Sequence, residues 1–377
     1  MRPNLKLVEK QPIQLKDLQL PNEGDEETYS LHGVLAGRDL WWPALASFFI
    51  KQHSEKGATV LDASCGFGTA CLESVVLGRI PVGVSTSPLA VKITNAKCQP
   101  ADLTEVTMQI QLANLQRPVP INLYSDEIKP FFDLDTFREL VALRGLIDSN
   151  YSQVARYIEL ITLGILHGPS AGYLSVSTSA VLAPTASEQD RLNISKQQFP
   201  SYRQLAPRVL KRAALLFRDG IGSMISNTGK QGKFGLADPR NLKGLASGSI
   251  ALALYALPLP GRDANEVFPG QWVREWYARV PRASEQVLTV PNWGQYIVDT
   301  LNELSRVVAA NKKAILLIPS RTEKLLEKRY DEELVNFIQQ NFSDIWEIES
   351  WYKVPVKSQI VRAEKTPAVY PVVLRRK

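Results

Sequence analysis

The stretch that decides the fold reads Val60-Leu61-Asp62-Ala63-Ser64-Cys65-Gly66-Phe67-Gly68-Thr69. It starts as a buried strand, reaches an acidic residue, turns on two glycines and continues into a segment of helical composition. Glycines let the backbone approach a ligand closely, and the amino end of a helix adds a positive dipole. We therefore predict that this stretch is the ligand-binding loop of an α/β domain.

The segments that follow complete a strand–helix–strand–helix unit of a parallel sheet. We expect a strand at 58–63, a helix at 69–77, a strand at 80–84 and a helix at 87–99, with a further helix at 40–49 before them. Gly78 is a suitable residue to end the first helix of the unit, and Ser87 with Pro88 suits the start of the second.

The pattern changes after residue 100, where the alternation typical of strands becomes rare. We expect a mostly helical insertion at 101–235, with helices at 135–144, 151–166 and 201–217. Strands are expected again at 249–256 and 314–319, helices at 295–308 and 323–341, and a C-terminal antiparallel hairpin at the sheet edge from 345–354 and 368–374. The predicted organisation is an extended arm at 1–27, an α/β domain formed by 28–100 and 236–377, and the insertion.

The composition excludes some classes of protein and favours others only weakly. The chain has 377 residues, and its net charge of +6 reflects 44 basic against 38 acidic residues, so an anionic partner is favoured slightly. Its three cysteines and three histidines lack the spacing of a metal site. The N-terminus does not resemble a signal peptide, and no apolar run is long enough to span a bilayer. We expect a cytoplasmic protein without a metal or a membrane.

The glycine loop resembles the cofactor motif of the amino-group DNA methyltransferases, which methylate N4 of cytosine or N6 of adenine with S-adenosylmethionine. Other segments are similar to the same family. They are the upstream segment 29–33, the approach to the second strand at 77–84, the turn 88–90, the insert segments 165–168 and 173–175, and the acidic turn 237–242. The resemblance implies an α/β, Rossmann-like methyltransferase fold with a target-recognition region at about 101–235. The cofactor residues it implies are Asp62, Gly66, Gly68, Thr69, Ser85 and Asp238.

The first departure from the family lies at the end of the second strand. Active members carry an acid there that binds the ribose hydroxyls of the cofactor, and this chain has Ser85. A neutral hydroxyl cannot make the charge-assisted bidentate contact, which we expect to cost about 1–3 kcal/mol of cofactor binding. Phe67, which replaces a small serine of the family, could also fill the space near the methionine portion. We therefore expect no cofactor, or S-adenosylmethionine if the pocket is open.

The second departure lies in the catalytic loop. The family reads serine, aspartate or asparagine, then two prolines and an aromatic residue that stacks on the flipped base. This chain places Ala256, Leu257, Pro258 and Leu259 there, so only Pro258 fits. Alanine cannot accept a hydrogen bond from an amino group, and leucine cannot stack as a ring does. Using Tyr255 as the aromatic supplies no polar group ahead of the prolines, and a rescue by Asp263 or Asn265 stays open.

Several basic residues are candidates for nucleic-acid binding. They are Lys211, Arg212, Arg218, Lys230, Lys233, Arg240, Arg274 and Arg279. Contacts from the first six would be salt-dependent, although a solvated surface with a flexible loop at 229–233 explains them as well. Arg274 and Arg279 alternate with Trp272, Trp276 and Tyr277, a pattern that suits base stacking but suits core packing of a helix at least as well.

These observations lead to one hypothesis and two alternatives. We expect a non-catalytic subunit that binds nucleic acid, DNA rather than RNA, within a larger defence, modification or mobile-element assembly. One alternative is an active DNA methyltransferase with an unusual catalytic loop. The other is a scaffold that binds only protein.

Overall fold

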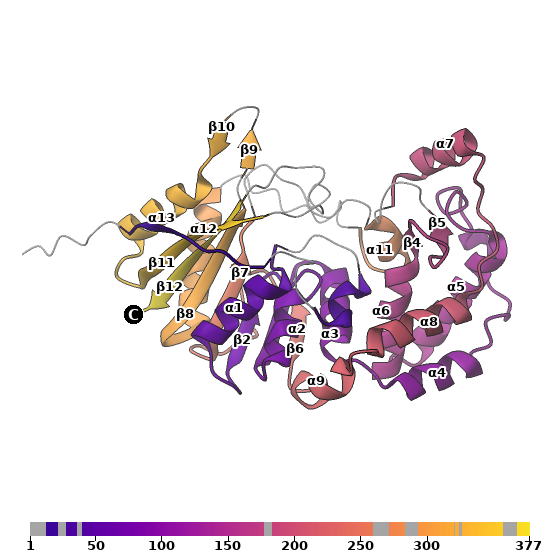
Figure 1. The fold of residues 1–377 in the computed structure, drawn as a ribbon, viewed down its shortest axis with the longest axis horizontal. Helices are drawn as coiled ribbons and strands as arrows, with labels where there is room; N and C mark the ends of the chain where they lie inside the picture. Colours follow the sequence, from indigo (N-terminus) through magenta and orange to yellow (C-terminus); the bar gives the residue numbers. More distant parts are fainter. Residues whose placement is uncertain are drawn as a thin grey trace, which may run out of the picture.

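The computed structural model describes residues 13–21, 28–35, 40–176, 183–258, 271–282, 293–319, 321–323, 326–356 and 368–377. Eight of the described strands form one large sheet in the order β1-β11-β12-β8-β7-β2-β3-β6 (Figure 1). Their bounds are Leu15–Asp17 for β1, Thr59–Asp62 for β2, Ile80–Ser85 for β3, Lys233–Leu236 for β6, Ile250–Ala256 for β7, Val308–Pro319 for β8, Trp346–Pro355 for β11 and Ala368–Arg376 for β12.

The direction of these strands defines the fold class. β6, β3, β2, β7 and β8 run parallel to one another, whereas β12 lies antiparallel between β8 and β11. β2, the first of the parallel strands along the chain, is central among them, and the strand order reverses on either side of it. With β12 inserted as an antiparallel strand, this is a Rossmann-like methyltransferase fold. The predicted α/β class, with a mostly parallel sheet and a C-terminal antiparallel pair, is confirmed.

Helices cover both faces of the sheet, which explains why its central strands are apolar throughout. α1 (Pro43–His53) packs against Val60, Leu252 and Leu254 on one face. α12 (Trp293–Val307) and α13 (Tyr330–Asn341) pack against the alternate residues, such as Leu61 and Ala253, on the other face. Burial on both faces fixes the register of β2, and with it the position of the loop that follows.

The strand–helix unit around the glycine loop forms as predicted. α2 spans Thr69–Val76 and α3 spans Pro88–Cys98. The Ser87 hydroxyl accepts a hydrogen bond from the backbone N–H of Ala90 at 3.3 Å, so Ser87 is the N-cap that the sequence indicated.

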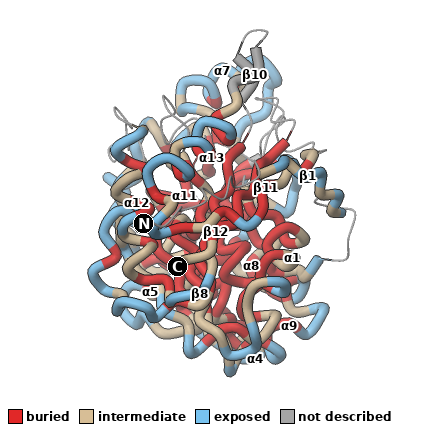
Figure 2. Tube along the Cα trace, turned by 90° about the vertical axis from the view of Figure 1, so that its left-hand side faces the viewer, coloured by how far each residue is buried: buried red, intermediate tan, exposed pale blue. Residues whose placement is uncertain are grey.

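The segment between α3 and β6 is mainly helical. Its elements are α4 (Leu103–Leu112), η2 (Ile121–Leu123), α5 (Leu134–Ser149), α6 (Gln153–Ile165), α7 (Ala186–Lys196), α8 (Leu205–Phe217) and α9 (Ile221–Gly229), with short strands β4 (His167–Gly168) and β5 (Ser175–Val176). β6 pairs with β3, so the boundary expected at residue 235 falls inside a strand of the sheet. In Figure 2 the buried residues occupy the interior, while exposed residues line outer elements such as α7.

One core joins the helical segment to the glycine loop. Phe67 of the loop belongs to the same buried cluster as residues of α5, α6 and α8. Later in the chain, α11 (Trp272–Ala278) contributes Val273 and Tyr277 to this cluster rather than to the sheet. The glycine loop and the helices therefore share their packing.

Two expectations about the elements need correction. The C-terminal pair is not at the sheet edge, because β1, from the expected extended arm, pairs in parallel with β11. A short hairpin, β9 (Arg321–Glu323) with β10 (Leu326–Lys328), replaces the start of the helix expected at 323–341. α13 begins only at Tyr330, where acidic residues enter its first turn, as the helix dipole favours.

Candidate functional site

The glycine loop is a tight turn held from the inside. Asp62 is 2% exposed, and its carboxylate accepts a hydrogen bond from the N–H of Ser64 at 3.1 Å. Gly66 and Gly68 have φ angles of +44° and +76°, which favour glycine. A Cβ on Gly68 would also lie 3.0–3.2 Å from atoms of Thr94. The backbone of this turn needs both glycines and can approach a ligand closely.

The helix after the turn and a buried lysine complete the loop. Gly68 is the N-cap of α2, and Thr69 is its first residue. The Lys97 ammonium, on a residue 2% exposed, donates to the Phe67 carbonyl at 3.0 Å. The loop is therefore preorganised, with helical N–H groups at its end that suit an anionic or nucleotide-like ligand.

Ser85 ends β3 beside this loop. Its hydroxyl accepts a hydrogen bond from the N–H of Ser87 at 3.1 Å, and its carbonyl accepts from Ala237 at 3.1 Å. The side chain therefore stabilises the turn into α3. It supplies no negative charge to a ribose.

Asp238 follows β6 at the same edge of the sheet. Its carboxylate accepts from the Arg240 side chain at 2.9 and 2.6 Å and from the Arg240 N–H at 2.9 Å. Partial burial opposes ionisation, but these bonds prevail and lower the pKa of Asp238. The Arg240 guanidinium also lies 5.0 Å from the ring centre of Tyr296. The acid that the resemblance assigns to adenine is thus engaged by a neighbouring cation.

Phe67 points into the core. It is 6% exposed, and the guanidinium of Arg274 lies 5.9 Å from its ring centre. Arg274 is itself 6% exposed and donates to the Gln271 side chain at 2.9 Å, while burial lowers its pKa to about 10. A residue so deeply buried does not fit the surface phosphate contact expected for Arg274.

The upstream segment 29–33 contributes His32 to a buried pair with Glu73. It forms a short 3-10 helix, η1 (Ser30–Val34), and His32 Nε2 lies 2.7 Å from the Glu73 carboxylate on α2. Burial lowers the pKa of His32 despite this carboxylate. The histidine in the motif was a signal, but its partner on α2 is visible only in the structure.

The loop after β7 is packed as a core segment. Leu257 is 1% exposed and belongs to the cluster beneath α12, and its N–H donates to Leu317 at 2.9 Å. The N–H of Ala256 donates to the Ser64 hydroxyl at 3.3 Å, and the Pro258 carbonyl accepts from the Trp293 indole at 2.9 Å. These three backbone groups are therefore bonded within the protein.

The alternative aromatic residue for this loop, Tyr255, belongs to the core. Tyr255 is 2% exposed, and its hydroxyl bonds to that of Tyr296, so it cannot stack on a flipped base. Leu259, Asp263 and Asn265 lie outside the described residues.

The basic candidates do not gather on one surface. Lys230 precedes β6 and Lys233 is its first residue, so both lie at the amino edge of the parallel strands, opposite the glycine loop. Lys211 and Arg218 are exposed on or next to α8. Three others have internal partners: Arg212 donates to the Gly33 and Val34 carbonyls, Arg240 pairs with Asp238, and Arg279 pairs with Asp148.

The aromatic residues beside Arg274 are core residues. Trp272 packs edge-on against Phe131, and Trp276 stacks with Phe132 and Phe137. The core-packing interpretation of this pattern is therefore the one that the structure supports.

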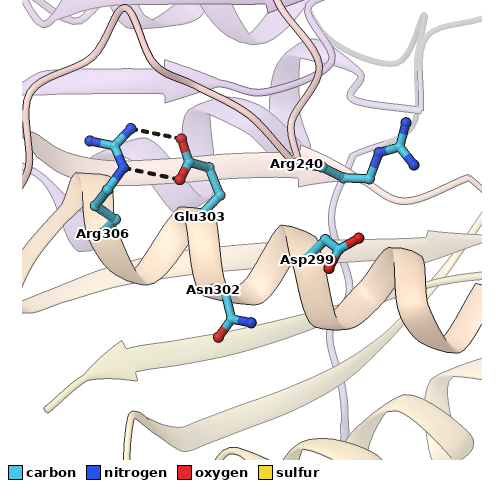
Figure 3. A pocket seen from close by; sticks show the side chains of 5 residues that line it. All are labelled: Arg240, Asp299, Asn302, Glu303 and Arg306. Atoms are coloured by element: carbon cyan, nitrogen blue, oxygen red, sulfur yellow. Dashed lines mark hydrogen bonds and ion pairs between the residues drawn. The ribbon is translucent and has the colours of Figure 1, made fainter.

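An open cavity of about 410 Å³ lies between α12 and the loop after β6, and Figure 3 shows its lining residues. They are Arg240, Asp299, Asn302, Glu303 and Arg306. Glu303 accepts from the Leu242 N–H, and Arg306 donates to the Leu242 and Leu245 carbonyls at 2.9 and 2.8 Å. These contacts fix the loop after Asp238 to α12. Glu303 and Arg306, which line the cavity, therefore stabilise the fold.

Among the described residues no group of histidine, cysteine and acidic side chains could hold a metal ion. No described helix combines the length and the apolar character needed to cross a membrane.

Comparison with known proteins supports a methyltransferase-like chain. No protein-family model matches it. It is 24% identical over 141 residues to the type II methyltransferase M.MjaII of Methanocaldococcus jannaschii, a match that covers 34% of this chain and 26% of that protein. The chain thus spans about a quarter of the length of this curated relative.

Solved structures of methyltransferases resemble the chain more distantly. TrmN from Thermus thermophilus covers 92% of this chain, and the chain covers 52% of it, at 10% identity and a TM-score of 0.37. An rRNA methylase from Streptococcus thermophilus covers 90%, with 99% of its own length matched, at 7% identity and a TM-score of 0.33. At these values the assignment of the fold rests on the strand order.

Proposed function

We propose that the protein binds nucleic acid without transferring a methyl group, as a non-catalytic subunit of a larger assembly in the cytoplasm. The observation that carries the proposal is the loop after β7. Leu257 is buried in the core and Tyr255 is bonded to Tyr296, so the described part of the loop offers no acceptor side chain and no free ring to a target base. The partner we propose is DNA rather than RNA, because the motif resemblance is to DNA methyltransferases.

The cofactor site supports the same proposal in two parts. The backbone of the glycine turn and the amino end of α2 fit a nucleotide-like cofactor such as S-adenosylmethionine. The side chains do not fit as well, because Ser85 is neutral and Asp238 is held by Arg240. We therefore propose that S-adenosylmethionine binds weakly or not at all, and we derive no reaction step through it.

A mobility-shift assay tests the binding function. The full chain is titrated against labelled duplex DNA and against single-stranded RNA over a series of salt concentrations. We expect DNA to be shifted at low salt and released as salt rises, since phosphate contacts displace counterions. If neither nucleic acid is shifted at low salt, the proposal fails and a scaffold that binds only protein takes its place.

A further inference from the structure

Two arginines that the sequence did not single out converge on one turn of the helical segment. The turn is 169–172, which connects β4 to β5 and is exposed. Arg203 Nη1 donates to the carbonyls of Ala171 and Tyr173, each at 3.1 Å. Arg208 Nε donates to the same Ala171 carbonyl at 3.3 Å. Two positive groups are therefore held next to each other by backbone acceptors.

No acidic side chain compensates this charge within the described part of the chain. The ion pairs of the described residues include neither Arg203 nor Arg208, and the rest of their N–H groups make no hydrogen bonds to acids. Burial lowers the pKa of Arg203, and the charge of the neighbouring Arg208 lowers it further. Like charges held near each other repel, and an anion bound between them would relieve this repulsion.

Each side chain is set in position by its own element. The N–H of Arg203 donates to the Thr136 hydroxyl on α5 at 2.7 Å. Arg208 lies on α8, and its Nη1 donates to the Gln204 carbonyl at 2.9 Å. These bonds use only part of each fork of five N–H donors, and a guanidinium fork suits the oxygens of a phosphate.

The turn lies at the end of the helical segment that faces the glycine loop. Tyr173, whose carbonyl accepts from Arg203, packs its ring so closely on Gly168 that a Cβ there would lie 2.3 Å from it. Tyr173 also acts electrostatically on Arg274, which lies over Phe67 of the glycine loop. Figure 1 shows β4 and β5 next to α11 at this end.

From these contacts we propose that Arg203 and Arg208 form a phosphate-binding pair for the backbone of the nucleic acid. The proposal rests on the nucleic-acid binding proposed above and adds the residues that contact the strand. A strand bound at 169–172 would run from the helical segment towards the edge of the sheet that carries the glycine loop.

The test compares variants in binding a labelled duplex DNA by fluorescence anisotropy over a salt series. The double variant Arg203→Gln/Arg208→Gln should bind about tenfold more weakly at low salt, and its salt slope should fall by about 1 per arginine. Arg208→Gln alone, at a half-buried residue on α8, should lose about half of this effect on a logarithmic scale. Arg208→Lys should retain most of the binding because it keeps the charge.

Lys51→Gln/Lys56→Gln is the matched control, since it removes two exposed charges between the end of α1 and the start of β2, at the opposite edge of the sheet. It should leave the affinity within about twofold of the wild type. If the wild type binds and the arginine variants bind equally well, the arginine pair is wrong while the nucleic-acid function stands. If the wild type binds no DNA, both proposals fall together. Thermal unfolding of each variant confirms that it is folded.

Discussion

The loops after β2 and β7 follow neighbouring parallel strands, but they have different contents. The loop after β2 keeps its buried acid, its two glycines in the left-handed region and a helix at its end. At the end of β7 and in the loop after it, this chain has Ala256 and Leu257 where the amino-group DNA methyltransferases have a polar residue and a proline. Leu257 is buried. The comparison teaches that the conformation of a methyltransferase-like fold and the polar groups of a catalytic loop depend on different residues.

The largest effect is expected from the second loop. Leu257→Ala removes a side chain that is 1% exposed in the cluster beneath α12 and leaves a cavity. We expect the free energy of unfolding to fall by about 2–5 kcal/mol. Denaturant unfolding measures this, with Leu236→Ala, at a residue 62% exposed, as the control. A loss for Leu257→Ala no greater than that of the control would show that the loop is not a core segment.

The first loop should respond through its backbone. Gly68→Ala puts a Cβ on a residue with φ of +76° and 3.0–3.2 Å from Thr94. The strain and the contact should lower the free energy of unfolding by about 1–3 kcal/mol. Gly57→Ala is a matched control, since its φ is +79° but its Cβ would meet nothing within 4 Å. Equal losses in the two variants would assign the whole effect to φ and none to the contact with Thr94.

Ser85, the position that the resemblance assigns to the ribose of the cofactor, can be tested by adding a negative charge. Ser85→Asp provides the acid that the family places at the end of β3, and we expect the affinity for S-adenosylmethionine to rise about tenfold, as about 1.4 kcal/mol of charged hydrogen bonding implies. Isothermal calorimetry on the wild type and the variant measures this change. Tight binding by the wild type, with no gain in the variant, would contradict the view that the cofactor contacts are degraded.

The smallest effect is expected at Asp238, the acid that the resemblance assigns to the adenine of the cofactor. Arg240→Gln removes the partner of Asp238, and because the pair is partly exposed we expect a loss of less than about 1 kcal/mol at neutral pH. The pKa of Asp238 is lowered in the folded protein. The pair therefore contributes stability above the unfolded pKa and loses it as the pH falls through the folded value. The free energies of unfolding of wild type and variant should differ at neutral pH and become equal at acidic pH. A difference that persists at acidic pH would exclude this assignment.

Local patterns were enough to predict the centre of the fold. The strands and helices around the glycine loop follow from apolar runs, caps and glycines within 40 residues, so their bounds differ from the prediction by at most a few positions. α7 was missed although Thr185 and Glu188 form a capping box, a signal that the sequence carries. β1 could not be predicted, because a three-residue strand exists only through its pairing with β11.

The candidate site divides in the same way. Asp62, Gly66 and Gly68 occur where the motif places them, since their conformations are local. The burial of Arg274 and the convergence of Arg203 and Arg208 on Ala171 depend on segments that are far apart in the sequence. The sequence pattern left both base stacking and core packing open for Arg274, and it did not indicate Arg203 and Arg208.

The central claim is that the fold persists without methyl transfer. The most direct measurement incubates the full chain with S-adenosylmethionine carrying a labelled methyl group and with DNA of mixed sequence, alongside an active amino-group DNA methyltransferase as a positive control. The account predicts no label in the DNA above a blank without protein, under conditions in which the chain binds that DNA. Label in the DNA that depends on the protein and rises with time would contradict it.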